Sequence, residues 1–184
     1  MITVGIDEVG RGCWAGPLVA GAVLLREPLE GIKDSKLLSR SQREKLAEQI
    51  EAAAEVGLGW VSAAEVDALG LTEAVRIAME RALDQIESAY DEVIIDGNYN
   101  FLAGEPRARA VVKADASVPV VSAASIVAKV ARDRYMAELG SAYAVYEFAK
   151  HVGYGTALHL KLLKEHGVSD QHRKSYKPIR ELTA

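Results

Sequence analysis

Acidic residues follow three apolar stretches of this sequence, and their type and spacing point to metal-ion chemistry. They are Asp7 with Glu8, Asp96, and Asp115. Strand ends that gather at one edge of a sheet with crossover helices form a ligand crevice. Carboxylate oxygens there suit Mg²⁺ or Mn²⁺. Two such ions about 3.5–4 Å apart can activate a water and stabilise the leaving oxygen of an in-line displacement. The alternative is that these acids cap strands in solvent.

A second pattern overlaps the first acids and predicts a different ligand. Residues 10–15, Gly-Arg-Gly-Cys-Trp-Ala, match a variant of the dinucleotide-binding fingerprint and follow an apolar stretch. That fingerprint must open a helix, whereas here Gly16-Pro17 forms a turn signal before the strand-like run 18–25. The dinucleotide reading is therefore disfavoured. The glycines instead indicate a loop whose backbone N–H groups can approach a ligand closely.

The elements that must position these acids follow from hydrophobic periodicity and from turn and capping signals. The strands expected are 2–6, 18–25, 56–62, 92–95 and 109–112, and the helices expected are 39–54, 72–88, 118–143 and 156–167. The connection between the first two strands is too short for a crossover helix, so this pair is predicted to be antiparallel. Small residues at 122–125 would let the long helix pack close to the sheet.

Composition indicates a soluble globular protein with a strongly divided charge. Of 184 residues, 49% are apolar, and the single Cys13 excludes an internal disulfide and favours a reducing compartment. Residues 1–105 carry 9 basic and 19 acidic side chains, and residues 106–184 carry 13 and 7. This asymmetry fits an acidic catalytic region beside a surface that attracts a polyanion, although uneven surface decoration is the alternative. No apolar run approaches the ~20 residues of a membrane span, and no export signal is recognised, so a cytoplasmic location is expected.

For several other residues the sequence indicates a role less strongly. Arg11 and Lys36 are candidate phosphate contacts, with a solvated loop as the alternative for Lys36. Tyr154 lies between two glycines and would stack on a sugar or base, or pack locally in its turn. Cys13 is expected to be a small packing residue and Asp133 an ion-pair residue. The four histidines show no ligand spacing and are expected at the surface or at helix ends; they are His151, His159, His166 and His172.

Taken in order, the motifs resemble those of the type 2 ribonucleases H, specifically bacterial ribonuclease HII. The match covers nearly the whole chain, and its motifs are 7–12 (Asp-Glu-Val-Gly-Arg-Gly), 15–19, 34–36 (Asp-Ser-Lys), 95–98, 113–115, 122–133 and 153–156 (Gly-Tyr-Gly-Thr). Members of this family commonly have a proline after Gly-Arg-Gly, whereas this chain has Cys13-Trp14. That departure could change the shape of the recognition loop and hence the substrate preference, but not the catalytic chemistry.

The resemblance implies an α/β, ribonuclease H-like fold, in which a mixed five-stranded sheet is flanked by helices. The chain would be one catalytic domain, 1–184, with a helical C-terminal segment from about 144 to 184. By position, Asp7, Glu8, Asp96 and Asp115 would be catalytic carboxylates that bind two Mg²⁺ or Mn²⁺ ions. Gly10, Arg11, Gly12 and Tyr154 would recognise the ribonucleotide 2′-OH and the RNA–DNA junction.

The activity implied is hydrolysis of the phosphodiester on the 5′ side of a ribonucleotide. Substrates would be RNA:DNA hybrids and duplex DNA with a single embedded ribonucleotide, and the products would carry 3′-OH and 5′-phosphate ends. The expected form is a monomer away from membranes, with any replication-clamp partner unassigned. Two alternatives remain: a non-catalytic nucleic-acid-binding module on the same fold, and another nuclease or recombinase of this superfamily.

Overall fold

A five-stranded mixed sheet forms the centre of the computed structural model, which describes residues 1–32 and 38–183. The strand order is β3-β2-β1-β4-β5. The strands are β1 (Thr3–Val9), β2 (Leu18–Leu25), β3 (Ala54–Val61), β4 (Glu92–Asp96) and β5 (Ala108–Val111). β1 pairs antiparallel with β2, as the short connection predicted, and β2 pairs antiparallel with β3. β4 and β5 run parallel to β1, so the predicted mixed sheet is confirmed.

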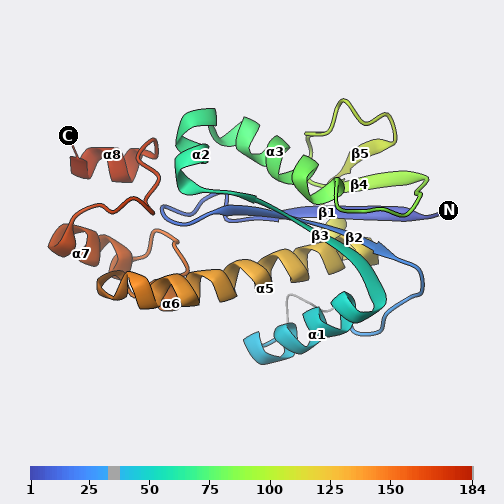
Figure 1. The fold of residues 1–184 in the computed structure, drawn as a ribbon, viewed down its shortest axis with the longest axis horizontal. Helices are drawn as coiled ribbons and strands as arrows, with labels where there is room; N and C mark the ends of the chain where they lie inside the picture. The colour runs from blue at the N-terminus through green and yellow to red at the C-terminus, as the bar shows by residue number, and fades with distance from the viewer. Residues whose placement is uncertain (33–37, 184) are drawn as a thin grey trace.

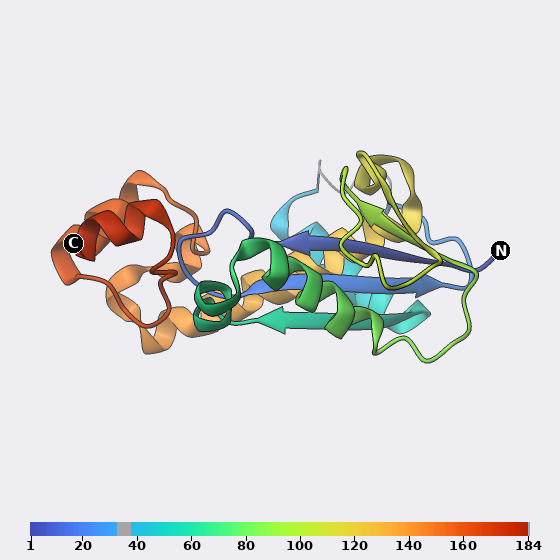
Figure 2. The same cartoon turned by 90° about the horizontal axis from the view of Figure 1, so that it is seen from above.

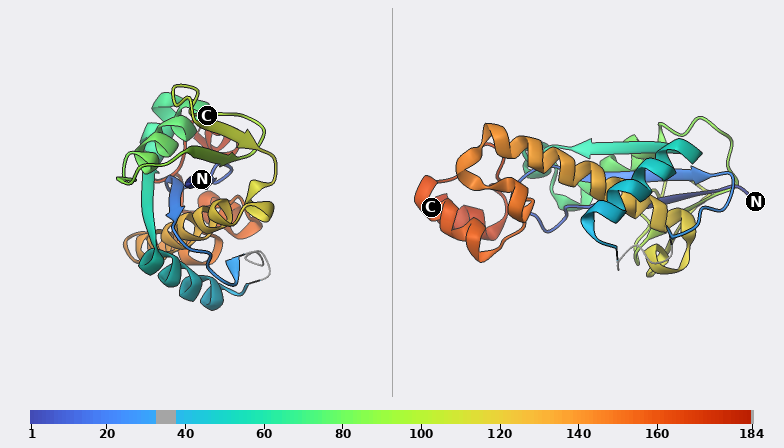
Figure 3. Two further views of the ribbon diagram at one scale, coloured as in Figure 1. Left: turned by 90° about the vertical axis from the view of Figure 1, so that its right-hand side faces the viewer. Right: turned by 90° about the horizontal axis from the view of Figure 1, so that it is seen from below.

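Two layers of helices cover the faces of the sheet (Figures 1 and 3). The helices are α1 (Arg40–Ala53), α2 (Ala63–Leu69), α3 (Leu71–Leu83), α4 (Ala114–Ser117), α5 (Pro119–Ala142), α6 (Phe148–His151), α7 (Ala157–His166) and α8 (Lys177–Thr183), with a 3₁₀ turn η2 at Ala144–Tyr146. One core packs α3 against the sheet, and a second core packs α1 and α5 against its other face. None of the helices in the described ranges is long and apolar enough to span a membrane.

α5 approaches the sheet closely because glycines face it. A Cβ on Gly5 of β1 would lie 2.4 Å from the backbone carbon of Val120, and one on Gly21 of β2 would lie 2.6 Å from the carbonyl oxygen of Ala124. Both distances are well inside van der Waals contact. The small residues at 122–125 therefore let α5 pack close to the sheet, as predicted. This packing holds β1, the strand that carries Asp7 and Glu8, against a long helix.

Local signals placed α1 correctly but missed the short helices α2, α4, α6 and α8 and the end of α3. Ser39 and Gln42 form the predicted capping box at the start of α1. α3 ends at Leu83 rather than near Ser88. The chain turns away after the helix, and the Ser88 N–H donates to the Glu55 carboxylate of β3 at 3.0 Å. The seven-residue α2, capped by Ser62, was not predicted.

Helices α6, α7 and α8 gather at the end of the sheet toward which β1 points, as Figure 2 shows. They enclose a third apolar core that includes Phe148, Leu163 and Ile179, together with Met136 from α5. Ala15, from the loop between β1 and β2, is also part of this core. The loop that follows the first two acids is therefore built into the C-terminal helices.

Candidate active site

The carboxyl ends of β1 and β4 bring three of the predicted acids to one edge of the sheet. β1 carries Asp7 and Glu8 within its last three residues, and β4 ends at Asp96. Because Ile6 pairs with Ile95 in the parallel register, Asp7 and Asp96 come next to each other on neighbouring strands. The Glu8 backbone N–H donates to Asp7 Oδ1 at 2.8 Å. The gathering of these acids predicted from the sequence is therefore present.

Asp115 lies beside Asp96 but is positioned by a helix rather than by a strand end. Lys113 adopts a left-handed conformation with φ 58°, which turns the chain from β5 into the short helix α4. The Asp115 N–H then donates to Asp96 Oδ1 at 3.3 Å, and Ser122 of α5 donates its hydroxyl to the Asp115 carbonyl. The expectation that Asp115 directly ends a strand is thus corrected, while its neighbourhood is as predicted.

The crowding of carboxylates shifts their protonation. Burial raises the pKa of Asp7 to about 7, helped by repulsion from Glu8 and Asp96 and opposed by a hydrogen bond from Ser125. Burial also raises the pKa of Glu8, while the Arg11 guanidinium, 3.0 Å from Glu8 Oε1, lowers it. An opposite charge nearby would favour the ionised forms. The site is electrostatically strained and would gain from a bound cation.

The donor set fits a hard divalent cation by its chemistry, since all four side chains offer carboxylate oxygens. Within 1–32 and 38–183, however, no three acidic, histidine or cysteine side chains are grouped tightly enough to hold a metal ion as they stand. The acids are instead linked through backbone amides, since the Glu8 N–H donates to Asp7 and the Asp115 N–H donates to Asp96. Sharing one ion among them would require the side chains to draw together.

Two buried arginines hold the Gly10-Arg11-Gly12 loop in place. Arg132 of α5 donates to the carbonyls of Pro17 at 2.8 Å and of Ala15 at 3.1 Å. Arg173 donates to the carbonyl of Gly16 at 3.0 Å and to that of Arg11 at 3.1 Å. Both side chains are fully buried.

Sequence reasoning missed both arginines as supports of the loop. A signal existed for Arg132. It lies on the four-residue spacing of buried positions along α5, which are Val120, Ala124, Ala128, Arg132 and Met136. A charged residue on an otherwise apolar row is expected to have a specific task.

Tyr154 lies in the loop between α6 and α7, and this loop packs against the Gly10-Arg11-Gly12 loop. The Trp14 N–H donates to the Gly153 carbonyl at 2.8 Å, which joins the two loops directly. Tyr154 is 39% exposed, as its glycine neighbours suggested. The structure thus brings Tyr154 near the other candidate recognition residues. Lys36, the remaining candidate, lies outside the described residues.

Three of the histidines are buried, so the expectation of surface positions is wrong for them, although His151 does lie at the end of α6 as the helix-end alternative predicted. His151, His159 and His172 form a cluster beneath the Tyr154 loop, in which His151 stacks on His159 with ring centroids 4.1 Å apart and His172 hydrogen-bonds to His159. His151 Nδ1 accepts the Gly153 N–H, and His159 Nδ1 donates to the Tyr154 carbonyl at 2.9 Å. His159 Nε2 therefore accepts from His172 Nε2 at 3.0 Å. Every ring is consequently neutral, and burial lowers the pKa of His159 and of His172 to about 4.

The predictions that Cys13 packs in the interior and that Asp133 forms an ion pair are confirmed. Cys13 is buried and packs in the loop. Asp133 forms an ion pair, but its partner is Lys129, at 2.6 Å and one turn earlier in α5, rather than a flanking arginine. Arg132 is committed to the loop carbonyls instead.

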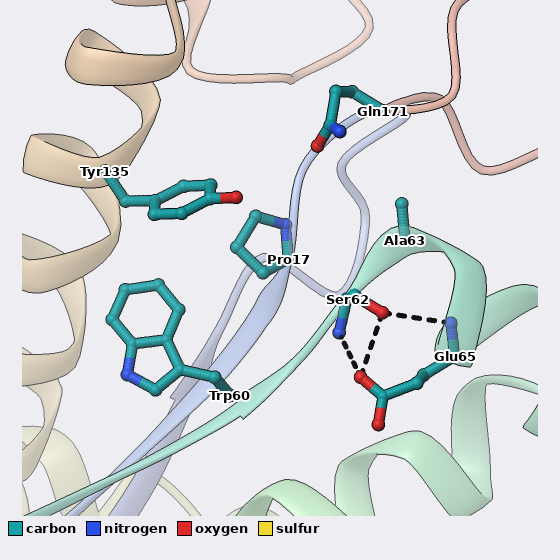
Figure 4. Close-up of a pocket in the computed structure, with 7 residues that line it drawn as sticks. All are labelled: Pro17, Trp60, Ser62, Ala63, Glu65, Tyr135 and Gln171. Carbon is teal, nitrogen blue, oxygen red and sulfur yellow. Dashed lines mark hydrogen bonds between the residues drawn. The ribbon is translucent and has the colours of Figure 1, made fainter.

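A hollow of about 390 Å³ lies apart from these acids, and none of the predicted site residues lines it (Figure 4). Trp60 and Tyr135 face each other in it with ring centroids 5.4 Å apart. Its carboxylate, Glu65, is already committed to the N-cap of α2 at Ser62 and to an ion pair with Arg81 at 2.9 Å. The hollow therefore offers aromatic surface and no free catalytic group.

Comparisons with known proteins agree along nearly the whole chain. The family model described as Ribonuclease HII matches residues 4–179. A ribonuclease HII from Shewanella loihica is 46% identical over 182 residues, which cover 96% of this chain and 88% of that protein.

Solved structures match the same fold. The ribonuclease H2 from Pyrococcus horikoshii is 29% identical with a TM-score of 0.84, and the match covers 99% of this chain and 97% of that one. Bst-RNase HIII, solved in complex with Mn²⁺, shares the fold with a TM-score of 0.77 at 19% identity, over 100% of this chain and 69% of that one.

Proposed function

The chain belongs to the ribonuclease HII family and is a type 2 ribonuclease H, and from this premise we propose which bond it cuts. The bond is the phosphodiester on the 5′ side of a ribonucleotide, in RNA:DNA hybrids and where one ribonucleotide lies within duplex DNA. The ends left are a 3′-OH and a 5′-phosphate. The observation that carries the proposal is the meeting of Asp7, Glu8 and Asp96 at one sheet edge, with Asp115 beside Asp96.

The proposed metal ligands are these four carboxylates, and the proposed cofactor is two Mg²⁺ or Mn²⁺ ions. When bound, such ions activate a water and stabilise charge on the reacting phosphate. The raised pKa of Asp7 supports the assignment, because buried neighbouring anions are stabilised by a cation. The Mn²⁺ complex of Bst-RNase HIII, which has the same fold, is consistent with it. Arg11 forms an ion pair with Glu8. Once a metal ion neutralises the Glu8 carboxylate, the Arg11 side chain would be free to contact a phosphate.

The proposed recognition elements are the two loops beside the acids. A 2′-OH both donates and accepts hydrogen bonds, so backbone groups of Gly10, Arg11 and Gly12 can distinguish a ribose from a deoxyribose. Tyr154, with its partly exposed ring, would stack on the sugar at the junction that follows. Lys36 stays a sequence-based prediction of a phosphate contact.

The basic C-terminal half supports binding of a polyanionic duplex. Exposed side chains there include Lys150, Lys161, Lys164, Lys174 and Arg180. Arg132 and Arg173 do not contribute, since both are buried. Phosphate contacts of this kind weaken steeply as salt rises.

The test is a cleavage assay on three labelled duplexes of one sequence: all DNA, DNA with one ribonucleotide, and an RNA:DNA hybrid. Each is incubated with Mg²⁺, with Mn²⁺ or with EDTA, and binding is measured in parallel by fluorescence anisotropy. We expect metal-dependent cleavage of the two ribonucleotide-containing duplexes and an intact all-DNA duplex. Binding of all three without cleavage under either metal would overturn the proposal in favour of a non-catalytic nucleic-acid-binding module.

A further inference from the structure

Residues 13–15 connect the two proposed recognition loops. The amides of Trp14 and Ala15 both donate to the Gly153 carbonyl, at 2.8 and 3.3 Å, and the Cys13 thiol lies 3.8 Å from the Val152 carbonyl. The loop after β1 runs alongside the C-terminal helices in Figure 2. The loop after β1 is thus joined directly to the loop that carries Tyr154.

The indole of Trp14 packs directly against Gly155. A Cβ placed on Gly155 would lie 2.1 Å from Trp14 Cε2 and 2.3 Å from Cζ2. Such an overlap is impossible, since carbon atoms in contact stay about 3.5–4.0 Å apart. Gly155 is not among the glycines with positive φ, so its backbone would accept a side chain. Glycine is therefore required at this position by Trp14 and not by the turn.

Trp14 also contacts the residue that holds the Tyr154 backbone. Its ring centroid lies 5.6 Å from that of His159, whose Nδ1 donates to the Tyr154 carbonyl. Trp14 thus touches Gly153 through its amide, Gly155 through its ring, and Tyr154 indirectly through His159. Each link adds to the hydrogen bonds that already restrict this loop, from Arg132 to the Val152 carbonyl and from the Gly153 N–H to His151.

We propose that Trp14 is a positioning residue, which fixes Tyr154 relative to Gly10-Arg11-Gly12 and so sets the preference for a single ribonucleotide over a long hybrid. The proposal rests on the function proposed above. A single ribonucleotide offers one junction, so the ring that stacks there must already be in place. A long hybrid offers many equivalent cleavage positions and depends less on any one junction contact. Trp14 acts through Tyr154, and it need not touch the substrate.

The test is a double-mutant cycle on a specificity ratio. The ratio is kcat/KM on the single-ribonucleotide duplex divided by kcat/KM on the hybrid, measured for wild type, Trp14→Ala, Tyr154→Ala and the double variant. We expect each single substitution to lower the ratio about tenfold, the size of a lost stacking contact. The double variant should match Tyr154→Ala alone, because removing Tyr154 leaves Trp14 nothing to position. Trp14→Phe should restore part of the ratio.

Two control variants separate positioning from general damage. Trp60→Ala removes the other tryptophan of the chain, which lines the hollow of Figure 4 together with Pro17 and Tyr135 and is not one of the proposed recognition residues, and should leave the ratio unchanged. Gly155→Ala should lower the ratio by displacing the indole, whereas Gly104→Ala should not, since nothing lies within 4 Å of its added Cβ. Gly155→Ala also tests the contact if Trp14→Ala fails to fold.

The outcomes distinguish this inference from the proposed function. If the effects of Trp14→Ala and Tyr154→Ala multiply in the double variant, or Trp14→Ala and Gly155→Ala both leave the ratio unchanged, the positioning role is overturned while the proposed function stands. If wild type does not cut the single-ribonucleotide duplex, the proposed function fails first, and the inference falls with it.

Discussion

The buried histidine cluster should make the protein lose stability between pH 7 and pH 5. An unfolded histidine takes up its proton near pH 6.5, whereas His159 and His172 in the folded state do so only near pH 4. Between these values the unfolded state binds more protons, so the free energy of unfolding falls as the pH falls. Each histidine accounts for about 2 kcal/mol between pH 7 and pH 5, and the two together for about 2–4 kcal/mol because they share a hydrogen bond.

The assay is thermal unfolding at pH 7 and pH 5 for wild type, His172→Gln and His166→Gln. For wild type we expect Tm to fall by roughly 5–15 °C from this source. Glutamine at 172 can still donate to His159 and accept from Ser169 but takes up no proton, so His172→Gln should lose about half as much. His166 lies outside the cluster and is exposed, so His166→Gln should behave as wild type.

Asp7 acts in the opposite direction but does not affect the comparison. Its pKa is raised to about 7, so the folded state takes up that proton first and gains stability as the pH falls. All three proteins contain Asp7, and the difference between them therefore isolates the histidines. An equal loss of Tm in wild type and His172→Gln would refute the reasoning.

Three further outcomes follow from the site. Asp7→Asn should reduce cleavage to background and, without metal, raise Tm by removing a crowded buried anion; normal turnover would contradict the metal assignment. Tyr154→Ala should lower kcat/KM about tenfold on a single ribonucleotide and less on a long hybrid, and equal losses would remove its junction role. Arg173→Met should lower the free energy of unfolding by about 2 kcal/mol, because two loop carbonyls lose their donor, while melting of the matched Lys174→Met should be unchanged; a stable Arg173→Met would contradict the loop support.

The parts of the fold that local sequence determines were predictable. The capping box at Ser39 predicted the start of α1 and the apolar run predicted β2, while the alternating run predicted β1, which continues past the predicted end at residue 6 to Val9. The gathering of acids at one edge was predicted from strand ends, whereas the parallel pairing of β1 with β4 that places Asp96 next to Asp7 was not. α3 ended early because Ser88 bonds Glu55, a residue 33 positions away that no local pattern identifies.

The supports of the site were less predictable because they arise only from tertiary contacts. His159 and His172 lie 13 residues apart without ligand spacing, and they meet only once α7 and the chain after it fold over the loop. Asp133 pairs with Lys129 because Arg132 points inward, which the sequence alone left open. The packing of Trp14 on Gly155 joins residues 141 positions apart, so only the folded structure reveals it.

The most direct test of the central claim is to map the cut in a duplex with one ribonucleotide at nucleotide resolution. Wild-type protein, a 5′-labelled strand and Mg²⁺ or Mn²⁺ should give a single product that ends one nucleotide before the ribonucleotide and carries a 3′-OH. The same reaction with EDTA should leave the strand intact. A cut on the 3′ side, or a strand left whole under both metals, would contradict the account.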